Sequence, residues 1–401
     1  MRAIPTRQGP TRRSLLAGAG SLALLPACAS PRNAPRPFGG HPGTGLMVER
    51  GGEVVLSRTD GLASLDPPRP FTPDTPFRVA SISKLAVAEV AQALVARGTL
   101  RWDADLSEAL GLTFRHPAFP SEAITLERLL SHTSGLQDPP AYWVAAPGDI
   151  RSLLTPDIFA PDAEPGMFFR YSNLNYGLAA TLLEATTDTR FDRLAREYTL
   201  APLGVEAGFN WAGVAPAAKS RGATLYRGEP GAWEAQVDDA DTLSSPLPSV
   251  LSEDGLDLET YLETYAPGTN GTLFSPQGGL RASLSDLLAM GRAWLLDAST
   301  TPVWDAATDP GDTADGHFVQ FGRGHYIYPP GRSPIPGVRL VGHVGEAYGF
   351  HGGLWAAPDH DAVFAFGEFG SAPEGVPMTG STPNLRATNA GYFAEVAPYL
   401  R

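Results

Sequence analysis

Two side chains near the start of one apolar segment have the types and the spacing needed for nucleophilic catalysis. The segment reads "FRVASISKLAVAEVAQALVARG", residues 77–98, and it holds Ser81 and Lys84 three positions apart. Its apolar residues leave little polar surface, so we predict a mostly buried helix that begins near Ser81. Residues three apart share one face of a helix, with Cβ atoms about 5–6 Å apart. The hydroxyl and the amine are therefore expected to be neighbours.

The pairing of Ser81 with Lys84 predicts an activated serine. A serine hydroxyl is a poor nucleophile until a base removes its proton. Lysine can be that base when burial lowers its pKa from the usual value of about 10.4 toward neutrality. The free backbone N–H groups at a helix start would stabilise the oxyanion that forms. We therefore predict Ser81 as the nucleophile and Lys84 as the base.

The cation composition of the chain supports this interpretation. The chain contains 30 lysine and arginine residues, and only Lys84 and Lys219 among them are lysines. Arginine keeps its proton under all usable conditions, so it cannot serve as a base. A chain that uses arginine almost everywhere would retain a lysine where deprotonation matters. The alternative is a chance Ser-x-x-Lys, which the burial of the predicted helix disfavours.

A second segment, "PGMFFRYSNLNYGLAATLLE", contributes Tyr171 and Asn173 just before another predicted helix. The Tyr171 phenol could share a proton with Ser81 and later pass it to the leaving group. The Asn173 amide could hydrogen-bond Lys84 and a substrate carbonyl at once. Tyr-x-Asn alone is a weak motif, and purely structural roles for both residues stay open.

A third segment, "VGHVGEAYGFHGGLW", places His343, Gly345 and Glu346 on a predicted strand, where we expect them to contact the substrate or its oxyanion. Glycine at position 345 would leave room for a substrate backbone lying beside the strand. The backbone N–H of Glu346 could form an oxyanion hole together with the N–H of Ser81. For His343 the alternative is a structural histidine whose hydrogen bonds are satisfied internally.

Several other kinds of site are disfavoured by the composition. The eight histidines show no metal-binding spacing and the single cysteine cannot form a thiolate cluster, so we predict neither a metal nor a cofactor. No serine has glycine both two residues before and two after it, as the nucleophile elbow of α/β-hydrolases requires. The formal net charge of −13 argues against a nucleic-acid partner. His132, near a predicted helix end, is expected to be structural.

The N-terminal segment predicts export. Arg12 and Arg13 precede a weakly apolar run, Leu15–Leu25, which is too short for a permanent membrane helix. The pattern resembles a twin-arginine export signal over residues 1–27, which implies transfer across a bacterial inner membrane into the periplasm.

The only cysteine, Cys28, follows this segment within "LLPACAS". "LPAC" is similar to a lipobox, in which the cysteine is acylated and tethers the protein to a membrane. Cleavage after the triplet 27–29, an A-x-A site, would instead release a soluble protein. We favour lipidation over release, and residues 28–44 are predicted to be a proline-rich tether.

Residues 45–401 are predicted to form one domain of the α/β (α+β) class. "LMVERGGEVVLSR" predicts a hairpin, and "VRLVGHVG", "HGGLWAAP" and "DAVFAFGEF" predict three further strands. Strands therefore dominate 45–100 and 320–401, whereas 101–319 is mainly helical with long loops. Strands at both ends indicate one antiparallel sheet completed by both ends of the chain, with a helical part over it.

Individual helices are expected at several places in the domain. "LERLLSHTSGL" predicts a helix that ends at Gly135. "SLSDLLAMGRAWLL" predicts a helix with Ser283 or Ser285 as its N-cap, and "PNLRATNAGYFAEVAPYL" predicts a closing helix. The acidic, turn-rich stretch 236–259 is expected to be a solvent-facing loop.

The chain resembles the class C β-lactamase-like serine hydrolases from about Gly45 onward. The resemblance rests on five segments in the family's order: "FRVASISKL…ALVARGTLRWDADL", "ITLERLLSHTSGL", "PGMFFRYSNLNYGLAATLLE…APLG", "FSPQGGLRASLSDLLAMGRAWL" and "GHVGEAYGFHGGLW". This family includes penicillin-binding DD-peptidases, D-aminopeptidases and β-lactamase-like esterases. It implies a β-lactamase/transpeptidase-like fold, with a five-stranded antiparallel sheet and a helical subdomain. By motif match it implies functional roles for Ser81, Lys84, Tyr171, Asn173, His343 and Gly345.

The third motif departs from that of true β-lactamases. They carry Lys-Thr-Gly where this chain carries His-Val-Gly, residues 343–345, without the cation and hydroxyl that help hold a substrate carboxylate. The resemblance therefore favours an esterase or a D-amino-acid peptidase acting on a small ester, peptide or D-amino-acid substrate. Glu346 would disfavour anionic substrates. A β-lactamase, or an inactive penicillin-binding or sensing protein, remains the alternative, and the oligomeric state is left open.

Overall fold

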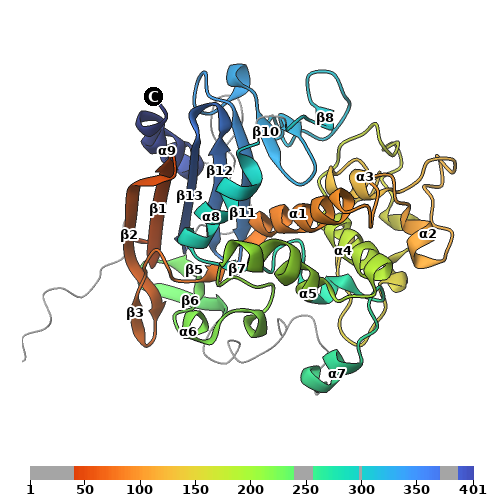
Figure 1. The fold of residues 1–401 in the computed structure, drawn as a ribbon, viewed down its shortest axis with the longest axis horizontal. Coiled ribbons are helices and arrows are strands. Elements are labelled where there is room, and N and C mark those ends of the chain that lie inside the picture. The colour runs from red at the N-terminus through yellow and green to blue at the C-terminus, as the bar shows by residue number, and fades with distance from the viewer. Residues whose placement is uncertain (1–39, 239–255, 298–299, 371–386) are drawn as a thin grey trace, which may run out of the picture. The chain divides into compact units, whose positions relative to one another are not determined.

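The computed structural model describes residues 40–238, 256–297, 300–370 and 387–401. The predicted export signal and Cys28 lie outside the described residues, as does most of the predicted acidic loop. No helix within the described ranges is long and apolar enough to cross a membrane. Figure 1 shows a sheet built from both ends of the described chain, with the helices of the middle segment beside it.

The main sheet contains nine strands among the described residues, and all their pairings are antiparallel. In spatial order they are β3 (Pro68–Pro70), β2 (Glu53–Leu65), β1 (Gly43–Arg50), β13 (Ala362–Phe369), β12 (Phe350–Ala357), β11 (Leu340–Ala347), β10 (Tyr326–Tyr328), β9 (Gln320–Phe321) and β8 (Trp304–Asp305). The hairpin β1–β2 and the strands β11, β12 and β13 confirm the predicted strand segments.

The predicted strand number of five is wrong. The five long strands β2, β1, β13, β12 and β11 form the middle of the sheet, but β3 extends one side and β10, β9 and β8 extend the other. These additional strands are only two or three residues long. Such short segments show no alternation of apolar and polar residues, so the sequence pattern contained no signal for them.

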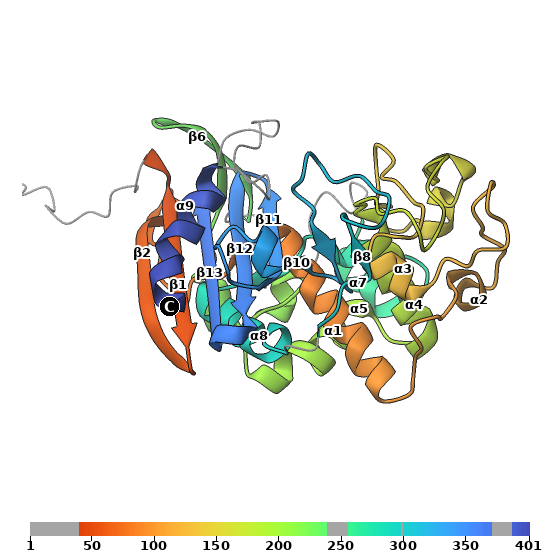
Figure 2. The ribbon, with the colours of Figure 1, turned by 90° about the horizontal axis from the view of Figure 1, so that it is seen from above.

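The nine helices of the described residues lie mainly in the middle of the chain. They are α1 (Ser83–Ala96), α2 (Leu106–Leu110), α3 (Leu126–Leu130), α4 (Leu174–Thr187), α5 (Phe191–Ala195), α6 (Pro216–Lys219), α7 (Leu258–Thr264), α8 (Leu284–Leu295) and α9 (Ala387–Val396). Figure 2 shows α1 between the sheet and the helices α3 and α4. Most residues of α1 are buried, as predicted.

Strands also occur inside the range predicted to be mainly helical. β5 (Leu225–Glu229) and β6 (Ala232–Val237) form a separate hairpin. β4 (Phe77–Arg78) pairs with β7 (Arg281–Ala282), two segments that lie far apart in the sequence. This small pairing matters for the site because β4 leads directly into the segment that carries Ser81.

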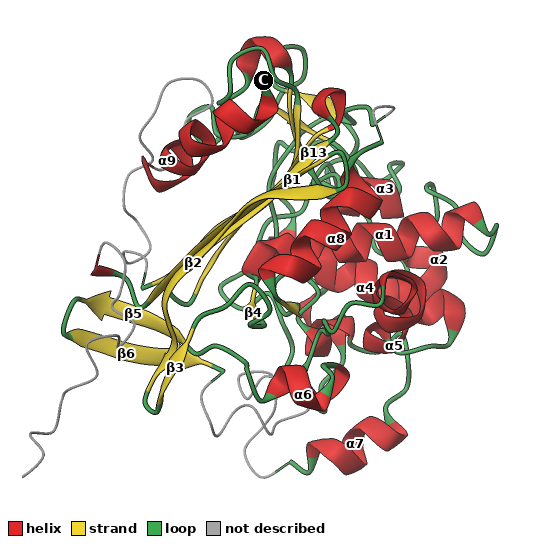
Figure 3. Ribbon diagram, turned by 60° about the vertical axis from the view of Figure 1, so that its left-hand side comes forward, coloured by secondary structure: helices red, strands yellow, loops and turns green. Residues whose placement is uncertain are grey.

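The sheet buries both of its faces, and the strand period of two decides which residue faces which layer. Met47 and Val363 pack with α8, whereas their neighbours Val48 and Phe364 belong to the core on the opposite face. Phe393 of α9 contacts the ring of Phe364 on that opposite face. Figure 3 shows α9 on one side of β1 and β13, with α8 and α1 on the other.

Two helix ends illustrate where local signals hold and where they fail. α8 begins with a capping box, in which Ser283 and Asp286 bond each other's backbone N–H groups, so Ser283 is the N-cap. The helix predicted to end at Gly135 is shorter, because α3 ends at Leu130. His132, two residues later, adopts a φ of 59° in the left-handed region, and no helix continues through such a residue.

Candidate active site

Ser81 lies on a tight turn between β4 and α1. The short 3₁₀ helix η2 (Ala80–Ile82) contains Ser81, and α1 begins two residues later. Ala80 has a φ of 49°, in the left-handed region that is strained for a residue with a Cβ. The Ser83 hydroxyl holds the turn, since it donates to Ala80 O at 2.6 Å and accepts the N–H of Leu280 at 2.9 Å. The turn presents Ser81 just ahead of the α-helix.

Lys84 is fully buried and its amine is held by three oxygen atoms. Nζ lies 3.0 Å from Ser81 Oγ, 2.9 Å from Asn173 Oδ1 and 2.9 Å from the backbone oxygen of Gln277. Burial lowers the pKa of Lys84 from 10.5 to about 7, and the charge of Asp138 opposes this change. A change of that size corresponds to about 5 kcal/mol against the protonated amine.

The three oxygens around Lys84 can accept from all three N–H groups of the protonated amine, and they also accommodate a neutral amine. A neutral amine has two N–H donors and one lone pair, whereas the protonated form has three donors and no acceptor. The oxygens of Asn173 and Gln277 accept but cannot donate, so they take the two N–H groups. The lone pair is then left for the Ser81 hydroxyl, which can donate to it. The predicted proximity of the Ser81 hydroxyl and the Lys84 amine is confirmed. The amine also bonds the oxygens of Asn173 and Gln277.

Tyr171 completes the group of side chains around Ser81. Its ring centroid lies 4.9 Å from Lys84 Nζ. Burial raises the pKa of the Tyr171 phenol, while a hydrogen bond with the Ser81 side chain opposes this change. The phenol therefore keeps its proton at neutral pH. Of the two candidate bases beside Ser81, only Lys84 has a pKa near neutrality.

Asp138 orients the segment that carries Asn173, and the sequence interpretation missed it. Its carboxylate accepts hydrogen bonds from Ser172 Oγ at 2.7 Å, from Leu174 N at 2.9 Å and from Asn173 Nδ2 at 3.0 Å. Because the amide nitrogen of Asn173 is bound in this way, its Oδ1 faces Lys84. Asp138 stands in the loop segment "LQDPP", which carries no motif that could have indicated its position.

His343 is fully buried, so its position does not fit the predicted contact with substrate. Its ring packs edge-on against Tyr326, with centroids 4.7 Å apart, and lies 6.3 Å from the ring of Tyr171. Burial holds the pKa of His343 well below its usual range, and the nearby charge of Lys84 lowers this pKa further. His343 is therefore a neutral side chain packed beside Tyr171.

Gly345 allows β11 to pack directly on the turn that carries Ser81. A Cβ at this position would lie 2.4 Å from the carbonyl oxygen of Val79 and 3.2 Å from a side-chain carbon of Ile82. The space beside Gly345 is thus filled by the chain's own backbone. It is not left open for a substrate, as the sequence had suggested. No larger residue fits without displacing the Ser81 turn.

One edge of β11 is open beside this turn. β10 pairs only with Leu340–Gly342, so residues 343–347 have no partner strand on that side among the described strands. Glu346 stands on this open part, with its side chain partly exposed and one carboxylate oxygen 3.7 Å from His351 Nδ1. The described residues include no group of metal-binding side chains.

The fold and these motifs agree with a match to a family model. The model described as Beta-lactamase matches residues 32–367, which is most of the chain. The chain belongs to the beta-lactamase family. The members of this family that it resembles in sequence carry different names.

Two curated relatives of the beta-lactamase family illustrate this range. Esterase EstB of Burkholderia gladioli is 41% identical over 103 residues, which is 25% of each chain. The D-aminopeptidase of Brucella anthropi is 26% identical over 343 residues, which is 82% of this chain and 56% of the relative. The chain therefore spans only part of the length of these relatives.

Solved structures of the family support the fold. The octameric penicillin-binding protein homologue from Pyrococcus abyssi superposes with a TM-score of 0.62 at 20% sequence identity. The superposition covers 90% of this chain and 74% of that chain. The β-lactamase/transpeptidase-like fold class predicted from the motifs is confirmed.

His132 has the structural position that the sequence led us to expect, and it supports Tyr171 in this beta-lactamase-family site. Its ring lies 4.3 Å from the ring of Tyr171, and its Nδ1 accepts the N–H of Ser172 at 3.1 Å. Burial keeps the pKa of His132 well below its usual range, so the ring is neutral. His132 and Asp138 thus hold the Tyr171–Asn173 segment from two sides.

Proposed function

We propose that this chain is a serine hydrolase that cleaves ester or amide bonds through an acyl-enzyme on Ser81. One observation carries the proposal: the buried Lys84 amine, with a pKa of about 7, lies 3.0 Å from the Ser81 hydroxyl. A buried lysine beside a serine is the arrangement that general-base activation requires. The family membership and the esterase and D-aminopeptidase relatives support the same reaction class.

The proposed reaction has two halves with balanced proton transfers. Lys84 takes the proton of Ser81 as the oxygen attacks the carbonyl carbon, and the backbone N–H groups of Ser81 and Glu346 stabilise the oxyanion. Tyr171 donates its proton to the departing alcohol or amine and regains one from Lys84. In the second half, water attacks the acyl group and gives its proton to Tyr171, while Tyr171 and Lys84 return a proton to the Ser81 oxygen. The acid product leaves and Ser81 recovers its proton.

The substrate class follows from the strand beside Ser81. The open edge of β11 at residues 343–347 can accept the backbone of an amide substrate as an added strand. This stretch carries Glu346 and no lysine, so it offers no cation to a substrate carboxylate. We therefore propose small neutral esters and D-amino-acid amides, whose free amine would be attracted to Glu346, over β-lactams. Export by the twin-arginine route, with lipidation at Cys28, is part of the proposal.

The substrate proposal predicts an order of turnover. We expect p-nitrophenyl butyrate to be cleaved fastest, D-alanine p-nitroanilide more slowly and nitrocefin slowest. The amide has a poorer leaving group than the ester, and the carboxylate of nitrocefin meets the charge of Glu346. Parallel measurement of kcat/KM for the three substrates checks this order. Turnover of nitrocefin orders of magnitude above the ester would make the chain a β-lactamase, and no turnover of any substrate would favour a binding protein.

The pKa of Lys84 predicts the pH profile. Since the base works only when neutral, kcat/KM for the ester should rise with pH and reach a plateau above about pH 7. Below that value the amine is protonated and the Ser81 proton has no acceptor. Steady-state rates between about pH 5 and 9 measure the midpoint of this rise in kcat/KM, which is the rising limb of the pH profile. A profile that is flat across this range, or that rises only near the ordinary lysine value, would contradict the role of Lys84.

The position of Asp138 predicts a moderate loss in Asp138→Asn. The neutral amide leaves Asn173 without its charged acceptor, so kcat/KM should fall about 10–100-fold. Removal of the nearby negative charge should also shift the rising limb of the pH profile to lower pH, because Asp138 raises the pKa of Lys84. Asp162→Asn, at an exposed position, is the matched control. It should change neither kcat/KM nor the pH at which the rising limb has its midpoint. If the midpoint of the rising limb is the same in Asp138→Asn as in the wild type, Asp138 has only a structural role.

A further inference from the structure

A second cavity lies against α1, apart from the group around Ser81. Its volume is about 380 Å³, within the usual range for small-molecule sites. It lies between α1, the C-terminal end of α8 and the loop that contains Arg323. The lining residues used below are Glu89, Gln92, Trp102, Trp294, Asp297 and Arg323. None of the residues placed around Ser81 lines this cavity.

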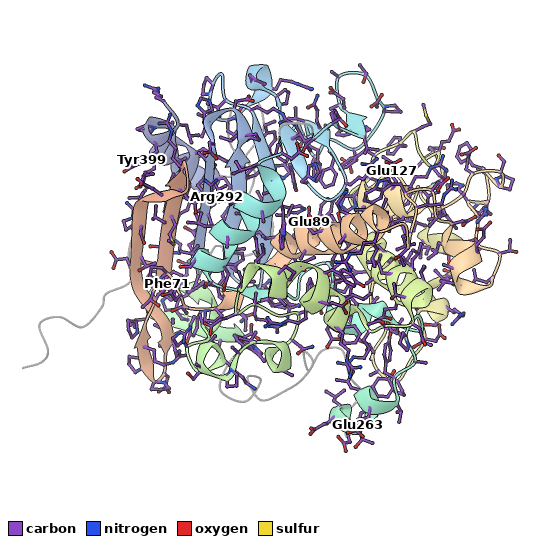
Figure 4. The ribbon with its side chains drawn as sticks, in the orientation of Figure 1. Phe71, Glu89, Glu127, Glu263, Arg292 and Tyr399 are labelled. Carbon is purple, nitrogen blue, oxygen red and sulfur yellow. The ribbon has the colours of Figure 1, made fainter. Side chains whose placement is uncertain are left out.

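Glu89 projects into this cavity from the helix that also carries Lys84 (Figure 4). The two residues are five positions apart, so their side chains leave α1 about 140° apart around its axis. No described residue forms a hydrogen bond or an ion pair with the Glu89 carboxylate. Burial raises the pKa of Glu89 from 4.5 to about 7. A carboxylate in this position is costly unless a cation or a hydrogen-bond donor satisfies it.

The other charged and titratable groups of the cavity do not supply that cation. Arg323 donates from Nε to Glu127 Oε1 at 2.8 Å, and its guanidinium lies 4.4 Å from the ring centroid of Trp102. Burial lowers the pKa of His325 to about 4, so this imidazole is neutral at physiological pH. Asp297 adds a second carboxylate to the wall. Among the described residues that line the cavity, Glu89 is the carboxylate without a hydrogen-bond or ion-pair partner.

We infer that this cavity binds a small organic ammonium ion, with Glu89 as its counterion. The ammonium group would give the Glu89 carboxylate the partner that no described residue of the cavity supplies. The Trp294 ring in the wall can attract a cation, and it can cover the apolar body of such a ligand together with the edge of Trp102 that Arg323 leaves free. Gln92 lies one turn from Glu89 on α1 and can accept a further N–H bond. The inference goes beyond the proposed hydrolysis and does not depend on it.

A matched pair of ligands tests this inference on the full-length protein. Benzylammonium and benzyl alcohol have nearly the same shape, and only the first is charged. Isothermal titration calorimetry at about pH 8 should give a Kd for benzylammonium at least about tenfold below that for benzyl alcohol. Because binding is measured rather than turnover, the result is independent of whether Ser81 is a nucleophile. Repeating the titration on Ser81→Ala should leave the Kd unchanged.

Variants locate the ligand in this cavity. Glu89→Gln should weaken benzylammonium binding at least about tenfold and leave benzyl alcohol unaffected. Glu263→Gln removes an equal charge from an exposed position on α7, labelled in Figure 4, and should bind as the wild type does. Thermal unfolding verifies that each variant is folded, and Trp294→Phe is a second cavity variant that should also weaken binding. No preference for the charged ligand, or unchanged binding by Glu89→Gln, overturns the inference.

Discussion

Ser81→Ala is expected to abolish both hydrolysis and covalent labelling of the protein. Removal of the oxygen that forms the acyl bond should lower kcat by about 10⁴-fold or more, since the remaining groups stabilise an oxyanion but provide no nucleophile. Intact-mass analysis of acid-quenched reactions with p-nitrophenyl butyrate should show one butyryl adduct on the wild type and none on the variant. Ser220→Ala changes an exposed serine on the surface and should keep both the adduct and the rate.

This experiment separates the serine mechanism from its alternatives. An adduct on a side chain other than Ser81, or an active Ser81→Ala protein, would contradict the proposed nucleophile. Absence of any adduct in a wild type that turns over the ester would indicate that deacylation is faster than acylation. A fluorophosphonate probe, which forms a stable bond to activated serines, then decides, because it must label the wild type and leave Ser81→Ala unlabelled.

Lys84→Arg should reduce kcat/KM by about 10³–10⁴-fold, the upper range for loss of a general base. The guanidinium stays protonated at every usable pH, so the Ser81 proton has no acceptor. The rising limb of the pH profile near 7 should disappear with the amine that causes it. Lys219→Arg, which changes the only other lysine, is the matched control and should leave the kinetics unchanged.

The complete burial of Lys84 makes a second variant necessary. Arginine is larger than lysine, so Lys84→Arg also overpacks a site that has no exposed surface. Lys84→Met keeps an unbranched side chain that is one atom shorter and removes the amine, and it should be as inactive as the arginine variant. Circular dichroism and thermal unfolding measure whether each variant is folded. A folded variant of either kind that retains about a tenth of the activity would remove Lys84 from the role of base.

The long regular elements of the fold could be predicted because their patterns are local. β1 and β2 join across a two-residue glycine turn, and β11, β12 and β13 are eight-residue strands with short connections. The capping box of α8 is likewise a signal within four residues. The short strands β3, β8, β9 and β10 could not be predicted, because only their neighbours in the sheet make them strands.

The positions of His343 and Gly345, the two ends of the third motif, depended on packing that no local pattern contains. Gly345 was expected to leave room for substrate, whereas its hydrogen faces the Val79 carbonyl of a turn far away in the sequence. His343 was expected at the substrate, whereas it is buried against Tyr326. Motif spacing identified which residues gather near Ser81, but it did not indicate which surface of each residue points into the site.

The sequence by itself determined that the Ser81 hydroxyl and the Lys84 amine are neighbours, because a three-residue spacing at the start of one helix fixes their proximity through local backbone geometry. Only the tertiary structure decided whether the amine can be neutral. Asn173 reaches Lys84 across 89 positions and Gln277 across 193, and Asp138 orients Asn173 from a loop without a motif. The pKa of a lysine depends on burial and on surrounding charges, and those come from segments that meet only when the chain has folded.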